Sequence, residues 1–429
     1  MKGRVGMKKK ILSLLLCLVM LLSLLSSCGE GNQATDGGGQ NQGTAGSEFF
    51  GKELSREKLE YALAEALKKI DYALPQFTDR FPSHNSIDNV YYAVDNDSGW
   101  TTGFWTGILW HAYELSGDRK YLDAATSQIE SYYTRIENKV GVNHHDMGFL
   151  YTPSCVAAYK LTGNGMAKEA AVMAADHLIT RYHESAKFIQ AWGEVGAEDN
   201  YRLIVDCLMN IPLLYWATEV TGDNRYREVA YNHFRTTLSV CYREDGSTYH
   251  TYYFDKTTGA PQRGVTAQGA SDESTWSRGQ AWGMYGPLLT YIYIQDSAAI
   301  DTFKATVDYY LRYLPEDYVP YWDLSFTSGD EPRDSSSAAI ALCAILEGIR
   351  HLDALDPDRE VYISAAKNIM SSLIDNYITS GVPEANGLLL HATYSKPDGL
   401  GVDEMNIWGD YFYIEALHRM LDPEWEPYW

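Results

Sequence analysis

Apolar residues recur three and four positions apart over much of this chain. The pattern is clear in REKLEYALAEALKKIDYAL (56–74), NRYREVAYNHFRTTLSV (224–240) and VYISAAKNIMSSLIDNYI (361–378). Because such spacing places apolar side chains on one face of a helix, it predicts amphipathic helices over these ranges. The alternation of apolar and polar residues that is typical of a half-buried strand is rare. The sequence therefore predicts an all-α protein.

A junction between two helices recurs along the chain. AYELSGDRKYLDAATSQI, AYKLTGNGMAKEAAVMA and ATEVTGDNRYREVAYNHF each place a glycine between two helical patterns, at Gly117, Gly163 and Gly222. Glycine favours the left-handed backbone that ends a helix, and a polar residue after it can cap the next helix. The glycines are 46 and 59 residues apart, which suits a helix pair plus a loop of variable length. Repeated helical hairpins predict an open solenoid or a closed ring.

The N-terminal residues have the pattern of an export signal. Basic residues precede an apolar run from Ile11 to Leu25, and the LSSC motif that ends at Cys28 resembles the lipobox of bacterial lipoproteins. We therefore expect residues 1–27 to be a lipoprotein signal peptide and Cys28 to carry a lipid. The alternatives are an ordinary cleaved signal and a single membrane anchor, although the apolar run is short for a spanning helix.

Residues 28–48 differ in composition from the rest of the chain. They are rich in Gly, Gln, Asn and Thr and hold almost no apolar side chains, so we expect a flexible tether. A second linker of this type is absent from the sequence of residues 49–429, which predicts a single domain there, although the length alone would allow two. The cysteines of that domain are too scattered for a zinc site or a disulfide framework, and we interpret them as buried apolar residues: Cys155, Cys207, Cys241 and Cys343.

The charge of the chain limits its partners. The formal net charge is −22, and removal of residues 1–27, which hold five basic residues, leaves 30 basic and 57 acidic residues, a charge of −27. This excess argues against nucleic acid as a partner. An anionic ligand would need a local cluster of hydrogen-bond donors, because the long-range field repels it. The sequence shows no metal-binding cluster, phosphate loop or nucleotide fingerprint, so we expect no metal and no cofactor.

Several stretches combine tryptophan or tyrosine with glycine and a polar residue. They are GWTTGFWTGILW, HHDMGFLY, QAWGE, SRGQAWGMYG, PYWDLSF and NIWGDYFY. Sugar rings present apolar C–H faces that stack on aromatic rings, while their hydroxyls bind polar side chains in the same groove. The shared pattern therefore indicates a carbohydrate site in a closed ring, although any single aromatic residue can equally be part of the core.

Two carboxylates are candidates for catalysis. Asp146 follows two histidines in NHHDMGFL, and Asp206 lies in NYRLIVDCLMNIPLLYWA, which we interpret as an otherwise apolar helix. A low-polarity environment disfavours the charged form of Asp206 and raises its pKa. A carboxyl that stays protonated near neutral pH can act as a general acid. The alternative is structural: Asp206 could cap a neighbouring helix or pair with a basic group.

Four motifs in the same order resemble one known family. HHDMGF, VDCLMNIPLL, QGASDESTWSRGQAWGMYG and WGDYFYIEAL together resemble the unsaturated glucuronyl hydrolases of glycoside hydrolase family 88, from about Trp100 to the C-terminus. Members of that family are single (α/α)6 barrels, so the resemblance implies this fold for residues 49–429. It also implies that Asp206 is the general acid/base and that Asp146 is the second essential carboxylate. The substrate-contacting positions that it implies are His145, His250, Gln268, Arg278, Trp282 and, less securely, Trp105.

The resemblance implies an unusual glycosidase reaction. Polysaccharide lyases leave a C4=C5 double bond in the terminal uronic acid of their products, and this family removes that sugar by acid-catalysed hydration of the double bond. Asp206 would protonate C4, and Asp146 would stay ionised and keep Asp206 protonated through like-charge repulsion. Arg278 would supply the donor that binds the uronate. The expected partners are unsaturated oligosaccharides of the glycosaminoglycan type.

Two other functions are compatible with the sequence. The related unsaturated rhamnogalacturonyl hydrolases, which act on pectin fragments, share the barrel and an RG-x-x-W motif like that at residues 278–282, but they resemble HHDMGF less closely. A non-catalytic glycan-binding lipoprotein would explain the lipobox and the aromatic residues but gives no reason for Asp206.

We expect an exported bacterial lipoprotein that is held by its lipid alone, on the cell surface or the periplasmic face. Ser395 and Lys396 in HATYSKPDGLG are either contacts for a sulfate group or part of a surface turn.

Overall fold

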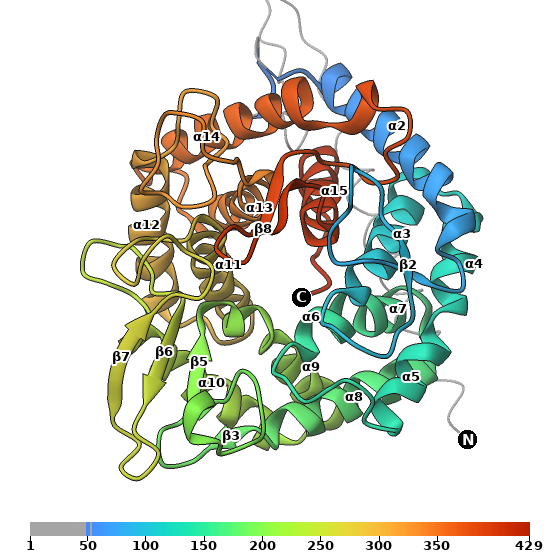
Figure 1. Cartoon of the computed structure of the whole chain (residues 1–429). Coiled ribbons are helices and arrows are strands. Elements are labelled where there is room, and N and C mark those ends of the chain that lie inside the picture. The colour runs from blue at the N-terminus through green and yellow to red at the C-terminus, as the bar shows by residue number, and fades with distance from the viewer. Residues whose placement is uncertain (1–48, 52–53) are drawn as a thin grey trace, which may run out of the picture. The chain divides into compact units, whose positions relative to one another are not determined.

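The helical hairpins form a closed double ring of helices (Figure 1). The computed structural model describes residues 49–51 and 54–429, so the predicted signal peptide and tether lie outside the described residues. The inner ring comprises α3 (Thr102–Ser116), α6 (Met147–Tyr151), α7 (Ala157–Thr162), α9 (Pro212–Thr221), α11 (Ser277–Ile294), α13 (Ser335–His351) and α15 (Ile407–Leu421). The outer ring comprises α2 (Arg56–Ala73), α4 (Arg119–Ser127), α5 (Ile129–Glu137), α8 (Gly165–Ile179), α10 (Asn224–Val240), α12 (Ser297–Arg312) and α14 (Arg359–Ser372).

The two rings form an (α/α)6 barrel. A π-helical turn joins α6 to α7 into one inner segment, and α4 and α5 together form one outer segment. The last inner helix, α15, packs against both α2 and α3, which closes the ring. The expected all-α barrel is therefore confirmed for the described residues.

The two rings differ in how their residues are buried. On α11 every residue from Ser277 to Thr290 is buried, because this helix is enclosed by its inner neighbours and by the outer ring. On α10 the buried residues recur three or four positions apart, as at Tyr226, Ala230 and Phe234, which is the pattern expected for a helix with one solvated face. Among the helices in the described ranges, none combines the length and apolarity that crossing a bilayer requires.

The glycine junctions predicted from the sequence are confirmed. The three glycines end α3, α7 and α9 in the left-handed conformation, with φ of 71°, 70° and 77° at Gly117, Gly163 and Gly222. The residue after each glycine accepts a hydrogen bond from a backbone N–H in the first turn of the next helix: Asp118, Asn164 and Asp223. These tight turns keep each inner helix antiparallel to the outer helix that follows it.

Short antiparallel sheets lie at one end of the barrel. The strand pairs are β1 (Phe81–Pro82) with β2 (Ala93–Val94), β3 (Tyr182–His183) with β4 (Phe188–Ile189), and β8 (Ala392–Ser395) with β9 (Leu400–Glu404). A three-stranded sheet has the order β5 (Arg202–Ile204), β6 (Thr251–Phe254), β7 (Pro261–Val265). All of these strands lie in connections that run from an outer helix to the next inner helix. They therefore gather at the N-terminal ends of the inner helices.

The last residues of the chain fill the opposite end of the barrel. The chain ends at the centre of the ring (Figure 1), where the Trp429 ring is buried and stacks on Phe412 at 5.8 Å. The indole N–H of Trp429 donates to Glu415 Oε2 at 2.9 Å. Lys160 on α7 donates to the carbonyls of Pro427 and Tyr428. These contacts close the end of the barrel at which the inner helices terminate.

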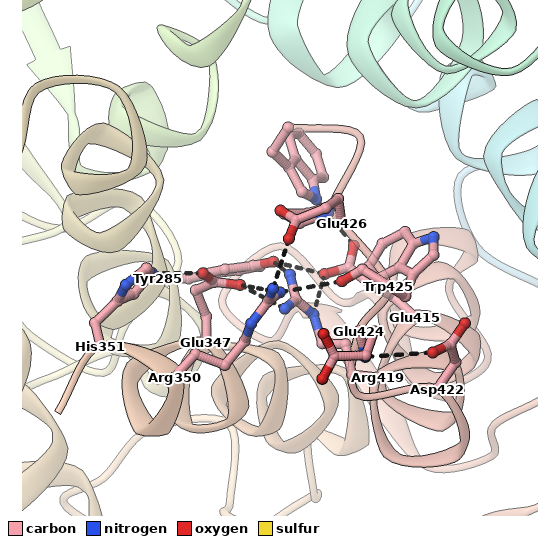
Figure 2. Close-up of polar contacts among 12 residues, drawn as sticks. Tyr285, Glu347, Arg350, His351, Glu415, Arg419, Asp422, Glu424, Trp425 and Glu426 are labelled. Atoms are coloured by element: carbon pink, nitrogen blue, oxygen red, sulfur yellow. Dashed lines mark hydrogen bonds and ion pairs between the residues drawn. The ribbon is translucent and has the colours of Figure 1, made fainter. Parts of the chain in front are cut away.

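A buried ionic network lies beneath this C-terminal segment (Figure 2). Arg419 donates to Glu415 Oε1 at 3.0 Å, to Glu347 Oε2 at 2.5 Å and to the hydroxyl of Tyr285 at 2.5 Å. Although burial opposes ionisation, the charge of Arg419 and the nearby His351 hold the pKa of Glu347 at about 2. One guanidinium therefore links α11, α13 and α15 and lies against two buried carboxylates.

Arg419→Ala should lower the free energy of unfolding by about 3–5 kcal/mol, because it removes a buried guanidinium that contacts both Glu415 and Glu347 and leaves Glu347 with only His351 and the more distant Arg350. Arg119→Ala is the matched control, since its ion pair with Asp123 is 3.7 Å long and exposed, and its Tm should hardly change. Urea and thermal unfolding measure both. Equal stability of the two variants would contradict a central role for the network.

Candidate active site

A cavity of about 160 Å³ opens at the N-terminal ends of the inner helices. It combines aromatic rings with titratable and hydrogen-bonding groups: Trp100, Asp146, Trp192, Asp206, His250, Gln268, Trp276, Arg278, Trp282 and Tyr394. A larger hollow of about 530 Å³ lies among residues 78–97 and 127–140, but it is lined by none of the predicted site residues. Because the smaller cavity brings together residues from five separate connections, it is the candidate active site.

Asp146 and Asp206 meet at one histidine. The Nε2 atom of His145 lies 3.3 Å from Asp146 Oδ1 and 3.4 Å from Asp206 Oδ1. His144 approaches the other oxygen of Asp146 at 3.0 Å. The His145 side chain is 1% exposed, whereas those of Asp146 and Asp206 are 7% and 17% exposed. The histidine thus lies behind the carboxylates, and Asp206 is the more accessible of the two.

A glycine allows the two carboxylates to come together. Gly148, two residues after Asp146, packs against the backbone of Asn210, and a Cβ at Gly148 would lie 2.3 Å from the Cα of Asn210. The side chain of Asn210 accepts a hydrogen bond from the N–H of Phe149 at 2.9 Å. The turn that carries Asp146 is therefore fixed against the turn that carries Asp206, which explains the glycine in NHHDMGFL.

The local structure at Asp206 differs from the sequence prediction. Asp206 does not lie within a long apolar helix: β5 ends at Ile204, and Asp206 is the second residue of a 3-10 turn, Val205–Met209, that precedes α9. The difference arises because Arg202–Ile204 pairs with β6, a contact with residues some 50 positions away that local periodicity does not reveal. The apolar setting itself is confirmed, since the neighbours Val205 and Cys207 are buried.

The two carboxylates have opposite pKa shifts. Burial, followed by the negative charge of Asp146, raises the pKa of Asp206 to about 7, against the lowering effect of His145 and Arg278. Burial also acts to raise the pKa of Asp146, but the charges and hydrogen bonds of His145 and His144 outweigh it and hold that pKa below its usual value. Near neutral pH the pair thus offers one ionised carboxylate and one carboxyl that can give and take a proton.

A raised pKa does not by itself identify the site. Burial also raises the pKa of Asp410 on α15 to about 7. Asp410 accepts hydrogen bonds from the backbone N–H of Leu389 and the hydroxyl of Tyr91, and it does not line the cavity. Its contacts fix loops at the rim of the barrel. What distinguishes Asp206 is its combination of raised pKa, exposure to the cavity and a partner carboxylate.

His250 presents a donor to the cavity. Its Nδ1 atom accepts hydrogen bonds from the backbone N–H groups of Ala267 and Gln268 at 3.0 and 3.2 Å. Burial and the charges of Arg278 and Arg202 lower the pKa of His250 to about 3, so the ring is neutral at neutral pH. Since Nδ1 is an acceptor, the proton of the neutral ring is on Nε2, which can donate to a bound ligand.

Arg278 is more constrained than the sequence suggests. Its terminal nitrogens donate to Asp334 Oδ2 at 3.0 Å, to the carbonyls of Thr393 and Tyr394 at 2.5 and 2.6 Å, and to Gln268 Oε1 at 3.1 Å. The structure therefore corrects the expectation that Arg278 offers free terminal donors to a uronate. Because Gln268 accepts from Arg278 through its oxygen, its amide nitrogen is the group left to donate into the cavity.

Aromatic rings form the walls of the cavity. Trp282 lines it as predicted. Trp105 does not: its ring is buried against Phe77, to whose carbonyl the indole N–H donates at 2.9 Å. The prediction for Trp105 is wrong because the face of α3 that carries it is turned away from the cavity. Four further wall residues are not predicted from the sequence: Trp100, Trp192, Trp276 and Tyr394. Trp100 and Trp192 lie in the stretches that combine aromatic residues with glycine, so the composition of these stretches pointed to them. The direction of each side chain could not be read from the sequence.

One oxygen or nitrogen atom from each of His145, Asp146 and Asp206 lies within 4.8 Å of the others, which is a spacing that could hold a metal ion. The ring nitrogen of His145, however, already lies between the two carboxylates at hydrogen-bonding range. Although burial opposes it, the charges of Asp146 and Asp206 raise the pKa of His145, and the doubly protonated ring supplies the positive charge that a metal would otherwise provide. The expectation that no metal takes part stays a prediction.

The hairpin that follows Thr393 forms a turn at the rim. The Ser395 hydroxyl donates to Asp398 Oδ2 at 2.6 Å, and Gly399 has the left-handed φ of 64° that closes the turn. Lys396 at the tip is exposed. These contacts correspond to the surface turn that was one of the two interpretations of this stretch.

An aromatic cavity that holds one ionised and one protonated carboxyl group, at the open end of an (α/α)6 barrel, is typical of an enzyme that acts on carbohydrates. Comparison with known proteins makes the class specific. The sequence model of Glycosyl Hydrolase Family 88 matches residues 69–422, so the chain belongs to that family. It is therefore a glycoside hydrolase.

Known relatives and solved structures agree with this assignment. The chain is 48% identical over 377 residues to an unsaturated chondroitin disaccharide hydrolase of Streptococcus agalactiae, covering 88% of this chain and 94% of the relative. It is 42% identical over 363 residues to an unsaturated glucuronyl hydrolase of a Bacillus species, covering 84% and 96%. The crystal structure of an unsaturated glucuronyl hydrolase from Streptococcus agalactiae has a TM-score of 0.86 at 47% identity and covers 90% of this chain and 97% of that one.

The rate of the reaction should have a bell-shaped pH dependence. Loss of the Asp206 proton should remove activity as the pH rises through about 7, and protonation of Asp146 should remove it only below about pH 4, since the pKa of Asp146 is depressed. His145→Gln should move the alkaline limb to higher pH, because the charge of His145 lowers the pKa of Asp206. The kcat/KM profile of both proteins measures this, and an alkaline limb that moves to lower pH in the variant would contradict it.

Proposed function

We propose that this hydrolase removes the terminal 4,5-unsaturated uronic acid from glycosaminoglycan fragments made by polysaccharide lyases, with unsaturated chondroitin disaccharides among its substrates. The observation that carries the proposal is that Asp146 and Asp206 meet at His145 in the cavity, with pKa values shifted in opposite directions. The 48% identity to the streptococcal relative that is named for the chondroitin disaccharide supports the choice of substrate.

The first step is proton transfer to carbon. The double bond between C4 and C5 is an enol ether, because C5 also bears the ring oxygen. The protonated Asp206 gives its proton to C4, the C4=C5 π bond supplies the electrons for the new C–H bond, and positive charge develops at C5 and the ring oxygen. Asp206 suits this role because it is exposed to the cavity and has a pKa of about 7.

The second step adds water. A water oxygen forms a bond to C5, and its proton returns to the carboxylate of Asp206, which restores the acid. The product is a hemiketal at C5. Its ring opens to a ketone at C5, which leaves a hemiacetal at C1, and this hemiacetal collapses to an aldehyde and releases the neighbouring sugar. The glycosidic bond is thus broken without displacement at C1, so the rule that relates carboxylate spacing to retention or inversion does not apply.

The other cavity residues orient the sugar. Asp146 stays ionised, repels a negative charge on Asp206 and accepts hydrogen bonds from sugar hydroxyls. His250 Nε2–H and the Gln268 amide are neutral donors whose direction is fixed by the backbone and by Arg278. Trp100 and Trp282 supply apolar surfaces for the ring faces of the sugar. Arg278 acts through Gln268 and through the positive field that it adds at the cavity.

Two alternatives fit less well. The pectin-directed unsaturated rhamnogalacturonyl hydrolases share the barrel and the chemistry, but the matching family model is that of family 88. A non-catalytic glycan-binding protein would have no use for a buried carboxylate pair of opposite protonation, because such a pair costs stability. Both carboxylates line the cavity, as catalysis requires.

The parent enzyme should consume unsaturated chondroitin disaccharide, with loss of the ultraviolet absorbance of the conjugated double bond. Asp206→Asn should lose at least about a hundredfold in kcat while still binding the disaccharide. Asp410→Asn is the matched control, since Asp410 is also buried with a pKa of about 7 but lies outside the cavity, and it should keep near-parent kcat. Unchanged kcat in a folded Asp206→Asn variant would refute the assignment. A parallel assay of disaccharides from hyaluronan, heparin and pectin ranks the substrates.

We also propose that the enzyme is an exported lipoprotein. Residues 1–27 would be its signal peptide, Cys28 its lipid attachment site, and residues 28–48 a tether to a single catalytic barrel that begins at residue 49. The support is the LSSC lipobox and the polar composition of the tether. The barrel would then face outward from the cell or lie on the periplasmic face, held only by the lipid.

Cys28→Ser should release the full-length protein from the membrane fraction without a change in specific activity, because the residue lies outside the barrel. Fractionation of cells followed by the disaccharide assay measures both quantities. Persistence of the variant in the membrane fraction would contradict the lipid anchor.

A further inference from the structure

Two arginines and a tyrosine form a row across the three-stranded sheet beside the cavity. Arg202 on β5 is paired with Tyr253 on β6, and Tyr253 is paired with Arg263 on β7. Directly paired residues of an antiparallel sheet lie on the same face. The guanidinium carbons of Arg202 and Arg263 lie 5.1 and 5.4 Å from the centre of the Tyr253 ring. The three side chains therefore form one continuous surface, here called the Arg202 row.

The Arg202 row begins at the wall of the cavity. The guanidinium of Arg202 lies 4.7 Å from the centre of the Trp192 ring, and Trp192 lines the cavity. The positive charge of Arg202 also contributes to lowering the pKa of His250, another lining residue. Strands are about 4.8 Å apart, so a row across three strands extends roughly 10 Å outward, which is longer than one sugar ring.

The two arginines of the row have few polar partners among the residues that the structure describes. In the described ranges 49–51 and 54–429, neither Arg202 nor Arg263 forms an ion pair with a carboxylate, and Arg202 has only a 3.4 Å hydrogen bond to Asn200. The Nε atom of Arg202 is buried and has no hydrogen-bond partner among these residues. Asp199 influences Arg202 through its charge alone. Two cations are thus held beside aromatic rings with donors left over.

This combination suits a negatively charged sugar. Guanidinium groups bind sulfate and carboxylate oxygens with paired hydrogen bonds, and aromatic rings stack on the faces of sugar rings. In a protein with a net charge of −27 after removal of residues 1–27, a local pair of unpaired arginines attracts an anion that the rest of the surface repels. The position of the row, outward from Trp192, corresponds to sugars beyond the bond that is broken.

We propose that the Arg202 row is a binding subsite for an anionic group, a sulfate ester or a uronate carboxylate, on the second or a later sugar after the scissile linkage. The inference rests on the proposed function and extends it. The enzyme prefers unsaturated tetrasaccharides and longer fragments that carry this anionic group to disaccharides, which do not reach the subsite. Trp192 links this subsite to the catalytic cavity.

The test compares substrate lengths in the Arg202→Gln/Arg263→Gln double variant and the parent. The substrates are unsaturated chondroitin disaccharide, an unsulfated unsaturated chondroitin tetrasaccharide and its sulfated form. We expect the ratio of tetrasaccharide to disaccharide kcat/KM to fall about tenfold in the double variant, the loss of one charge-assisted contact. The ratio of the parent should also fall with added salt. Arg119→Gln, an exposed arginine on the outer helix α4, is the matched control and should keep the parent ratio.

The outcomes distinguish a sulfate from a carboxylate as the bound group. They also distinguish failure of the subsite from failure of the proposed function. If the kcat/KM ratio of the double variant falls with both tetrasaccharides, the bound group is a carboxylate. If the ratio falls with the sulfated tetrasaccharide alone, the bound group is a sulfate. A ratio that equals the parent's with both substrates overturns the subsite, as does a fall of the same size in Arg119→Gln. If the parent does not consume the disaccharide at all, the proposed function fails instead.

Discussion

The contact of His145 with two carboxylates is the interaction on which the site depends. One ring nitrogen lies 3.3 and 3.4 Å from oxygens of Asp146 and Asp206, and a buried pair of like charges so close together is unstable unless one of them takes a proton. Asp146 has a second histidine beside it and keeps its charge. Asp206, which is the more exposed of the two, has the raised pKa and can hold the proton. The different surroundings of the two carboxylates therefore make Asp206 the acid before any substrate is bound.

The barrel makes this arrangement possible because of its topology. Every inner helix runs in the same direction, so the connections that lead into them meet at one end and can bring distant segments together. Gly148 lets the Asp146 turn touch the backbone at Asn210, and Asp334 anchors Arg278 from the neighbouring inner helix. At the other end, Trp429 and the Arg419 network tie the helices together. A rigid closed end and a loop-built open end suit a site that must hold two carboxylates in fixed contact.

The sequence predicts the repeating parts of the fold well and the site in part. Helix pairs and their glycine ends are local features, so Gly117, Gly163 and Gly222 could be placed from spacing alone. Asp146 and Asp206 could be named from a resemblance that spans several motifs. The 3-10 turn at Asp206 could not, because it depends on pairing between β5 and β6.

The errors at side chains have the same origin. Trp100 and Trp105 have similar neighbours in the sequence, but only Trp100, which precedes α3, reaches the cavity. Trp105 lies on α3, where its ring packs against Phe77. The acceptors of Arg278 at Asp334 and Thr393 lie 56 and 115 residues away. A pattern of residue types shows which side chains are present, whereas their direction and their partners follow from the tertiary structure.

Direct titration of the carboxyl groups tests the central claim, which is that burial beside an ionised Asp146 raises the pKa of Asp206 to about 7. Carbon-13 spectra of protein labelled at aspartate side chains, recorded against pH for the parent and for Asp206→Asn, follow each carboxyl. We expect two carboxyls that titrate near pH 7, from Asp206 and Asp410, and the loss of one of them in the variant. If the carboxyl that disappears in Asp206→Asn titrates near pH 4, as an ordinary aspartate does, the account is contradicted.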